Sequence, residues 1–273
     1  MIKRFLVLTL IFLFLISSCA EANTLIIATT TSLQDSGLLD FLIPKFESQY
    51  SIKVKTLAVG TGEAIALGKR GDADILLVHN KEMELELLNS GFASKREELF
   101  YNYFILVGPS QDPAGARGLD IEEAFRKIAT TSGVMFASRG DKSGTFSKEK
   151  NLWEKISINP EKASLIYLST GQGMAETLRI ASEKGAYTLT DWGTWVTQRK
   201  TLSLEVISRS GDDLENTYSV LLMNGEKLSG LHSKEASLFY SWITSPEALK
   251  MIENFGVENF GEPLFYLKKG SES

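Results

Sequence analysis

Short apolar segments alternate with helical patterns along this chain, and this alternation limits its fold more than any other feature. The first part predicts strands at residues 24–28, 52–57 and 74–78 and helices at residues 37–50 and 82–90. Strands that alternate with helices pair mainly in parallel, and the helices cover both faces of the sheet. Pro44 inside the first helix predicts a kink, because it removes a backbone donor. The sequence therefore predicts an α/β fold.

The pattern stops and restarts once, which predicts two lobes. An aromatic strand at residues 100–107 ends at Gly108-Pro109, and the next nine residues are rich in Pro, Gly and polar side chains. Beyond them come further alternating elements, and a strand at residues 217–224 is expected to pair with residues 103–107. We predict lobe I at residues 24–107 plus 218–273, lobe II at residues 108–217, a mainly parallel sheet flanked by helices in each, and two crossover strands as a hinge.

The chain begins like an exported protein. Residues 1–18 combine Lys3-Arg4, an apolar core and a small-residue end, which is the pattern of a secretory signal peptide. Residues 16–19 also look like a bacterial lipobox, which implies cleavage before Cys19 and a lipid anchor on its sulfur. The alternative is a non-lipidated signal with an incidental cysteine. Cys19 is the only cysteine, so the mature fold has no internal disulfide.

Composition and motifs exclude several functions. The net charge of −5 argues against nucleic acid as a partner, since no basic stripe is present. The two histidines, His79 and His232, are far apart and have no carboxylates at metal-ligand spacing. Neither a P-loop nor a dinucleotide-binding glycine motif occurs. We expect no metal and no cofactor.

One loop has the chemistry of an oxyanion site. Residues 138–145, Ser-Arg-Gly-Asp-Lys-Ser-Gly-Thr, follow a predicted strand and precede a predicted helix. A helix N-terminus presents unpaired N–H groups and partial positive charge. Ser143 and Thr145 add hydroxyls, Gly144 permits close approach, and Arg139 adds a fork of donors. The alternative is an ordinary polar turn, in which Asp141 caps the loop or orients Arg139.

Other predicted strands end in similar residues. The ends at residues 29–32, 60–62, 169–173 and 190–194 are rich in hydroxyls and glycine. In open α/β sheets ligands bind at the carboxyl ends of the strands. We therefore expect one shared site in a cleft between the two lobes.

Five stretches carry a resemblance to a known family: residues 27–38, 59–64, 71–79, 136–145 and 187–191. Together they resemble the tungstate-binding proteins of ABC importers, among the two-domain extracellular solute-binding proteins with phosphate- and molybdate-binding relatives. The resemblance implies a type II periplasmic-binding-protein-like fold, a monomer, a membrane permease as partner, and no enzymatic activity. The implied oxyanion ligands are Thr30, Thr31, Ser32 and Thr61 from lobe I and Arg139, Ser143, Gly144 and Thr145 from lobe II.

Several points stay open in the sequence. Asp141, Thr170 and Asp191 are expected beside or just behind the ligand, and either Asp74 or Asp141 could face it. Trp192 stands where the family suggests an arginine, which leaves selectivity open. A molybdate, phosphate or sulfate receptor is the alternative function. An enzyme acting on phosphorylated metabolites would need Asp191 with His79 as base or nucleophile.

Overall fold

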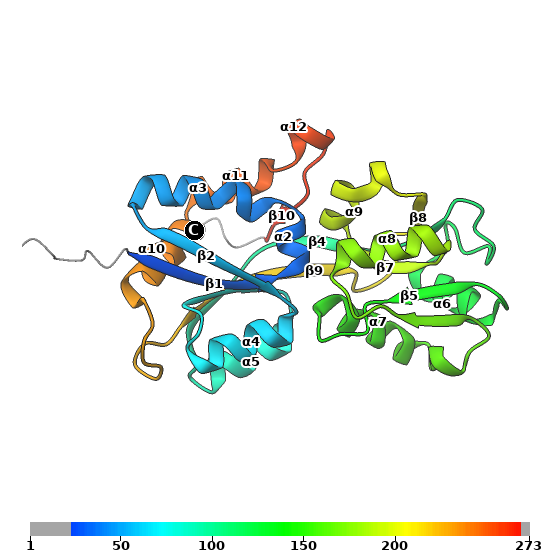
Figure 1. Cartoon of the computed structure of the whole chain (residues 1–273), viewed down its shortest axis with the longest axis horizontal. Helices are drawn as coiled ribbons and strands as arrows, with labels where there is room; N and C mark the ends of the chain where they lie inside the picture. Colours follow the sequence, from blue (N-terminus) through cyan, green and yellow to red (C-terminus); the bar gives the residue numbers. More distant parts are fainter. Residues whose placement is uncertain (1–22, 269–273) are drawn as a thin grey trace, which may run out of the picture.

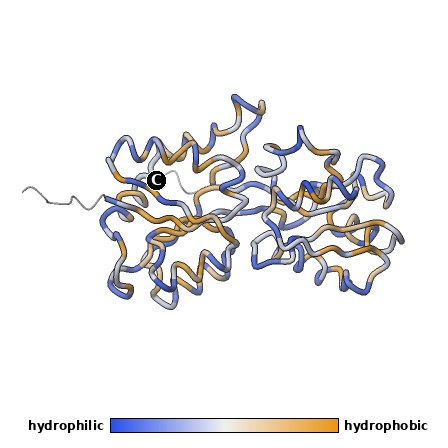
Figure 2. Tube along the Cα trace, in the orientation of Figure 1, coloured by the Kyte–Doolittle hydropathy of each residue, from blue (hydrophilic) through white to orange (hydrophobic). Residues whose placement is uncertain are grey.

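Two long strands join two lobes in the computed structural model, which describes residues 23–268 (Figure 1). The predicted signal peptide and Cys19 lie outside the described residues. Lobe I contains the N-terminal strands and the C-terminal helices, so the chain leaves it once and returns once. Figure 2 shows hydrophobic residues along the strands and hydrophilic residues in the outer loops.

The lobe I sheet has the strand order β10-β4-β9-β3-β1-β2. Its strands are β1 (Thr24–Thr30), β2 (Lys53–Val59), β3 (Ile75–Val78), β4 (Ala93–Pro109), β9 (Glu215–Met223) and β10 (Tyr266–Leu267). β1 pairs in parallel with β2 and β3, as expected for strands followed by helices. The crossover strands add antiparallel pairs, because they enter the sheet without a helical crossover, so the sheets of both lobes are mixed and not mainly parallel as predicted.

Helices cover both faces of this sheet (Figure 1). One face carries α3 (Leu38–Tyr50), α10 (Ser233–Ile243) and α11 (Pro246–Asn254), and the other carries α4 (Thr61–Arg70) and α5 (Lys81–Asn89). Side chains of β3 alternate between the two cores: Ile75 and Leu77 face the first helices, and Leu76 and Val78 face the second. Short helices α2 (Thr31–Asp35) and α12 (Val257–Phe260) complete the lobe.

Lobe II is built on the far half of β4. β7 (Thr188–Asp191) and β8 (Leu204–Ser208) pair antiparallel with β4, while β5 (Met135–Ser138) pairs in parallel with β6 (Ile166–Ser169). α6 (Ile121–Thr130) and α7 (Gly144–Lys155) lie on one side, and α8 (Met174–Lys184) and α9 (Trp192–Gln198) on the other (Figure 1). The single turn η1 (Pro160–Lys162) lies between α7 and β6, and the single turn η2 (Arg199–Thr201) lies between α9 and β8.

The pairing expected for the second crossover strand is wrong. Thr217 and Met223 of β9 are opposite Tyr101 and Ala93, so β9 pairs with the first half of β4. The apolar pattern predicts a strand only from residue 100, because residues 94–98 are Ser-Lys-Arg-Glu-Glu. β4 is instead 17 residues long and serves both lobes. It runs through the middle of the molecule and links the two halves directly.

Phe136 is the centre of the lobe II core, where it contacts Phe125 and Trp153 with ring centroids 5.4 Å and 5.3 Å away. Its side chain is fully buried. We expect Phe136→Ala to lower the free energy of unfolding of lobe II by about 3–5 kcal/mol, because it removes buried area and leaves a cavity. Urea unfolding measures this loss. The control is Ile166→Ala on β6, whose side chain is 52% exposed and should cost under about 1 kcal/mol. Equal losses would contradict the assigned core.

Candidate functional site

Helix N-termini from the two lobes meet where the lobes touch. The amide of Gly62, in the first turn of α4, donates to the carbonyl of Lys142, just before α7. The N···O distance is 3.2 Å. A Cβ atom added at Gly60 would lie 3.5 Å from the same carbonyl. Gly173, before α8, lies beside Thr31 at the start of α2. First-turn amides have no acceptor within their own helix, so this junction concentrates donors and partial positive charge.

Arg139 is buried at this junction. Only 4% of its side chain is exposed. Nη1 donates to Thr31 Oγ1 of the other lobe at 3.2 Å, and Nη2 donates to Asp141 Oδ2 at 2.5 Å. The other oxygen of Asp141 accepts from the amide of Ser143 at 3.0 Å. Asp141 thus both orients the guanidinium and caps the loop, the two roles that the sequence had suggested as alternatives.

Three buried donors at the junction have no hydrogen-bond partner among the described residues. They are Nε of Arg139 and the hydroxyls of Thr61 and Thr145. Thr61 begins α4 in lobe I and Thr145 lies in the first turn of α7 in lobe II, and both side chains are 1% exposed. A buried polar group without a partner costs about 1–3 kcal/mol, so each of these three groups calls for an acceptor such as a water molecule or a bound ion. The three atoms come from both lobes.

The remaining hydroxyls predicted for the site cap helices or contact one another. Thr30 is the N-cap of α2, and its Oγ1 lies 3.2 Å from Ser32 Oγ. Ser32 Oγ is 3.4 Å from the hydroxyl of Tyr218. Ser143 is the N-cap of α7, where Oγ accepts from the amide of Phe146 at 3.1 Å. The structure therefore places all eight predicted ligand residues at or near one interlobe junction.

Gly144 lies close to His79 of the other lobe. A Cβ atom added there would lie 2.6 Å from Cε1 of the His79 ring, which follows β3 in lobe I. His79 is held by a stacked contact with Tyr218, at 4.8 Å between centroids, and by a 2.5 Å bond from Nδ1 to Asn216 Oδ1. Burial, with a smaller contribution from the charge of Arg139, lowers the pKa of His79 to about 4. The ring is therefore neutral at physiological pH.

A chain of buried hydrogen bonds connects His79, at the junction, to the two crossover strands. Asn216 Nδ2 donates to Asn102 Oδ1 at 2.8 Å, and Asn102 Nδ2 donates to Asp191 Oδ1 at 3.2 Å. The chain thus runs from His79 through both crossover strands to the N-cap of α9. Asp191 also accepts from the amide and hydroxyl of Thr194, and burial raises the pKa of its carboxyl. Asp191 and His79 are joined only through the two asparagines, which does not match a base–nucleophile pair.

Sequence reasoning missed Asn102, Asn216 and Tyr218. Their signal was present, because two asparagines interrupt or adjoin otherwise apolar strands, where a buried amide needs partners. The residue type alone does not show which partners these are. The partners are set by the pairing of the two crossover strands, which places Asn102 beside Asn216.

Thr170 adjoins the Arg139 loop, because its amide donates to the carbonyl of Ser138 at 2.9 Å, whereas Asp74 lies elsewhere. Asp74 precedes β3, at the opposite end of the sheet, where it accepts from the amides of Ile26 and His232. Both N···O distances are 2.7 Å. The hydroxyl of Thr170 lies 2.9 Å from that of Thr177. Trp192 lines a hollow with Tyr103 and Tyr266. Of the two carboxylates that were expected to face the ligand, Asp141 lies in the Arg139 loop and Asp74 does not.

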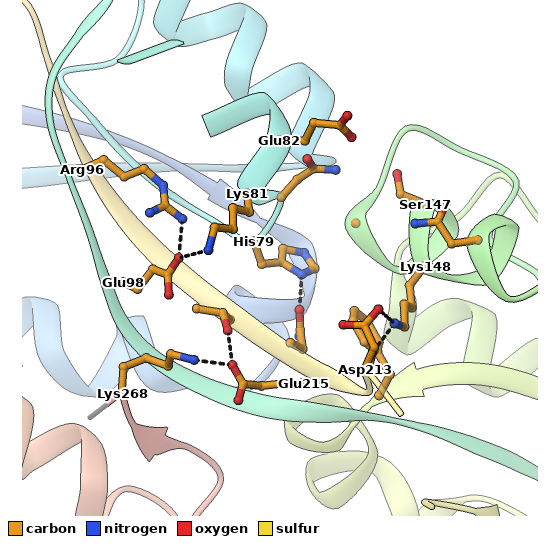
Figure 3. Close-up of a pocket in the computed structure, with 16 residues that line it drawn as sticks. His79, Lys81, Glu82, Arg96, Glu98, Ser147, Lys148, Asp213, Glu215 and Lys268 are labelled. Atoms are coloured by element: carbon orange, nitrogen blue, oxygen red, sulfur yellow. Dashed lines mark hydrogen bonds and ion pairs between the residues drawn. The ribbon is translucent and has the colours of Figure 1, made fainter. Parts of the chain in front are cut away.

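An interlobe cleft of about 410 Å³ lies beside His79 and Gly144 (Figure 3). Its charged side chains form ion pairs, including Lys81 with Glu98 at 3.3 Å and Lys148 with Asp213 at 2.8 Å. These pairs leave little uncompensated charge for an anion. Within residues 23–268, no cluster of His, Cys, Asp or Glu could hold a metal ion. No helix in the same part of the chain has the length and apolar character needed to cross a membrane.

A family model described as the PBP superfamily domain matches residues 17–247. The chain belongs to the PBP superfamily. Within this superfamily it is 42% identical over 246 residues to the tungstate-binding protein TupA of Peptoclostridium acidaminophilum, covering 89% of this chain and 85% of that protein. It is 37% identical over 240 residues to TupA of Campylobacter jejuni, covering 86% and 88%.

Solved PBP structures give the same result. The tungstate ABC transporter protein from Geobacter sulfurreducens superposes with a TM-score of 0.76 at 39% identity, covering 85% of this chain and 98% of that one. The tungstate-binding protein TupA from Desulfovibrio alaskensis G20 gives 0.75 at 39% identity, covering 90% and 99%. These matches confirm the resemblance and the two-lobed fold class predicted from the sequence.

The contact between Gly144 and His79 limits how closely the lobes can approach. We expect Gly144→Ala to hold the lobes further apart, because its Cβ would overlap the ring. Small-angle scattering of the mature protein should show a larger radius of gyration than the wild type. The matched control is Gly173→Ala, whose Cβ would lie at an ordinary 3.9 Å from Thr31 across the same junction. An unchanged radius for Gly144→Ala would contradict this contact.

Proposed function

We propose that this chain is the solute-binding protein of an ABC importer and that it captures tungstate between its lobes for delivery to the membrane permease. The observation that carries the proposal is the set of three buried, unpartnered donors at the junction: Arg139 Nε and the hydroxyls of Thr61 and Thr145. A tetrahedral oxyanion offers acceptors in several directions, so one such ion can satisfy donors from both lobes. The names of the relatives point to the same ligand.

The donor set suits an anion without a proton. Tungstate carries no proton at neutral pH, and buried charge is stable only when it is hydrogen-bonded throughout. Phosphate keeps a proton and favours a free carboxylate as acceptor. Both oxygens of Asp141, the carboxylate within the Arg139 loop, already accept hydrogen bonds from Arg139 and Ser143. This supports an unprotonated dianion, tungstate or molybdate, over phosphate.

Release would require the lobes to separate. We infer that β4 and β9 act as the hinge between lobe I, residues 24–107 plus 218–273, and lobe II, residues 108–217. The side chains of Phe104 and Leu106 pack in the lobe II core, which supports a boundary close to this part of β4. Closure would bury the anion and exclude water, and reopening would return it to solvent at the permease. The protein would thus retain and release the anion without catalysing a reaction.

We propose further that the mature protein is an exported monomer, in the periplasm or at the cell surface, tethered by a lipid on Cys19. This follows from the predicted signal and lipobox at residues 1–19. A receptor that feeds a permease must stay close to the membrane, and a lipid anchor on an otherwise water-soluble body provides that proximity.

Arg139→Ala tests the site directly. Loss of the guanidinium should weaken tungstate binding by about 2 kcal/mol or more, roughly 30-fold, because it removes a charge-assisted donor. Isothermal titration calorimetry with tungstate, molybdate, sulfate and phosphate measures the affinity and the selectivity together. The control is Arg179→Ala on α8, an arginine whose side chain is 61% exposed. Tight phosphate binding without tungstate binding, or an unchanged affinity in Arg139→Ala, would overturn the proposal.

Thr61→Val and Thr145→Val separate binding from folding. Each removes a buried hydroxyl without a partner while keeping the shape of the side chain. Tungstate affinity should fall by about 1 kcal/mol per variant, while the melting temperature without ligand should stay constant or rise. Thr197→Val is the control, because its hydroxyl donates to the carbonyl of Thr194 at 2.9 Å. A loss of stability with no loss of affinity at Thr61 and Thr145 would show that these hydroxyls serve the fold alone.

A further inference from the structure

We propose that Glu149 is a proton-binding site coupled to the oxyanion site, and that it takes up a proton from solvent when a dianion binds between the lobes. This inference rests on the proposed function for the presence of the dianion. It concerns a residue outside the predicted site, and it makes the affinity of the protein depend on pH in a defined direction.

Glu149 is a buried carboxyl directly behind the Arg139 loop. It lies on α7, and 2% of it is exposed. Oε2 accepts from the hydroxyl of Ser138 at 2.7 Å, and Oε1 accepts from the hydroxyl of Tyr167 at 2.6 Å and from Nε1 of Trp153 at 3.1 Å. Three donors from β5, β6 and α7 thus hold one carboxyl group. No arginine, lysine or histidine forms an ion pair with it in the part of the chain that the structure describes.

The link from Glu149 to the anion loop is short. The Ser138 hydroxyl that bonds Glu149 also accepts from the amide of Gly140 at 3.2 Å, so the two residues that flank Arg139 are tied to the carboxyl. Gly140 has φ +61° and packs so closely on Ser169 of β6 that a Cβ atom there would overlap the serine hydroxyl. The loop therefore has little room to move away from Glu149. A charge on one side of the loop then acts electrostatically on a charge on the other side.

The charges around Glu149 favour protonation close to neutral pH. Burial is the largest cause, and it raises the pKa of Glu149 to about 7, against the opposing effect of its three hydrogen bonds. The charge of the Asp141 carboxylate raises the pKa further, as a smaller effect. Tyr167 stays protonated, because burial and Glu149 raise its own pKa, and Glu161 adds negative charge on that side.

Neighbouring cations on α7 are engaged elsewhere. Lys148 donates to Asp213, and Lys150 lies over the ring of Phe146. The guanidinium of Arg139 is paired with Asp141, which largely offsets its charge as seen from Glu149. His79, with its pKa lowered to about 4, does not titrate in the neutral range. Glu149 is thus a group at this site whose charge changes near pH 7, and burial also raises the pKa of the Asp191 carboxyl.

A bound dianion would add two negative charges on the far side of the Arg139 loop. Like charges oppose each other, so the pKa of Glu149 must be higher in the complex than in the free protein. Between these two values the complex holds more protons, and binding takes them up. The affinity is then highest below about pH 7 and falls as pH rises, by at most about tenfold per pH unit for one proton. The hydroxyls of Tyr167 and Ser138 can rotate to accept the new O–H.

Calorimetry of tungstate binding to the mature protein, from about pH 6.5 to about pH 8.5 in buffers of different ionisation enthalpy, measures the proton count. We expect uptake that approaches about one proton per anion near pH 8, with affinity falling over the same range. Glu149→Gln should bind without net uptake and with affinity that varies little with pH. The matched control, Glu154→Gln, removes an exposed carboxylate from the same helix and should behave like the wild type.

Tyr167→Phe gives a second, independent test. It removes a hydrogen bond that lowers the pKa of Glu149, so the range of proton uptake should move to higher pH. This test remains if Glu149→Gln does not fold. Tungstate binding with no proton uptake, or unchanged uptake in Glu149→Gln, would overturn the coupling and leave the proposed function standing. Failure to bind any of the four oxyanions would overturn the proposed function itself, and the coupling with it.

Discussion

The buried guanidinium of Arg139 is the constraint on which the rest of the structure depends. A charge 96% removed from solvent is stable only if its donors are satisfied, and the protein supplies Asp141 from the same loop and Thr31 from the other lobe. One of its donors, Nε, is left without a protein partner. The protein thus satisfies most of the hydrogen bonds of the guanidinium and leaves one donor open among the described residues. An open donor can bind an anion, and the remaining bonds keep the site folded when the anion leaves.

The architecture delivers donors to this point from two directions. Strands β1 and β2 end in residues that begin α2 and α4, and β5 leads into the loop before α7. Each of these helices points its N-terminus at the junction, so the macrodipoles add without any extra charged residue. An acidic protein of net charge −5 can in this way attract an anion locally although its overall field repels one.

Behind the contact surface, buried polar groups hold the geometry. His79, Asn216, Asn102 and Asp191 form one hydrogen-bonded chain through both crossover strands, and Glu149 ties β5, β6 and α7 together behind the loop. Buried networks of this kind are costly if any member is unsatisfied, so they specify one arrangement strongly. The Arg139 loop is thereby held in one conformation, which would reduce the entropy lost if an anion binds there as proposed.

The sequence by itself determined the fold class and most of the alternation of strands and helices, and it predicted residues 138–145 as the oxyanion loop. These follow from local signals: apolar periodicity, glycine and hydroxyls at strand ends, and a capping pattern at residues 143–146. Helices α3 and α5 begin and end within one residue of the bounds that the pattern predicts. Only the tertiary structure decided that Asp74 lies at the far end of the sheet, that β9 pairs with residues 93–103, and that Glu149 lies behind the loop. These facts depend on which segments pack together. Some of those segments lie more than a hundred residues apart in the sequence, and a local pattern does not specify such a contact.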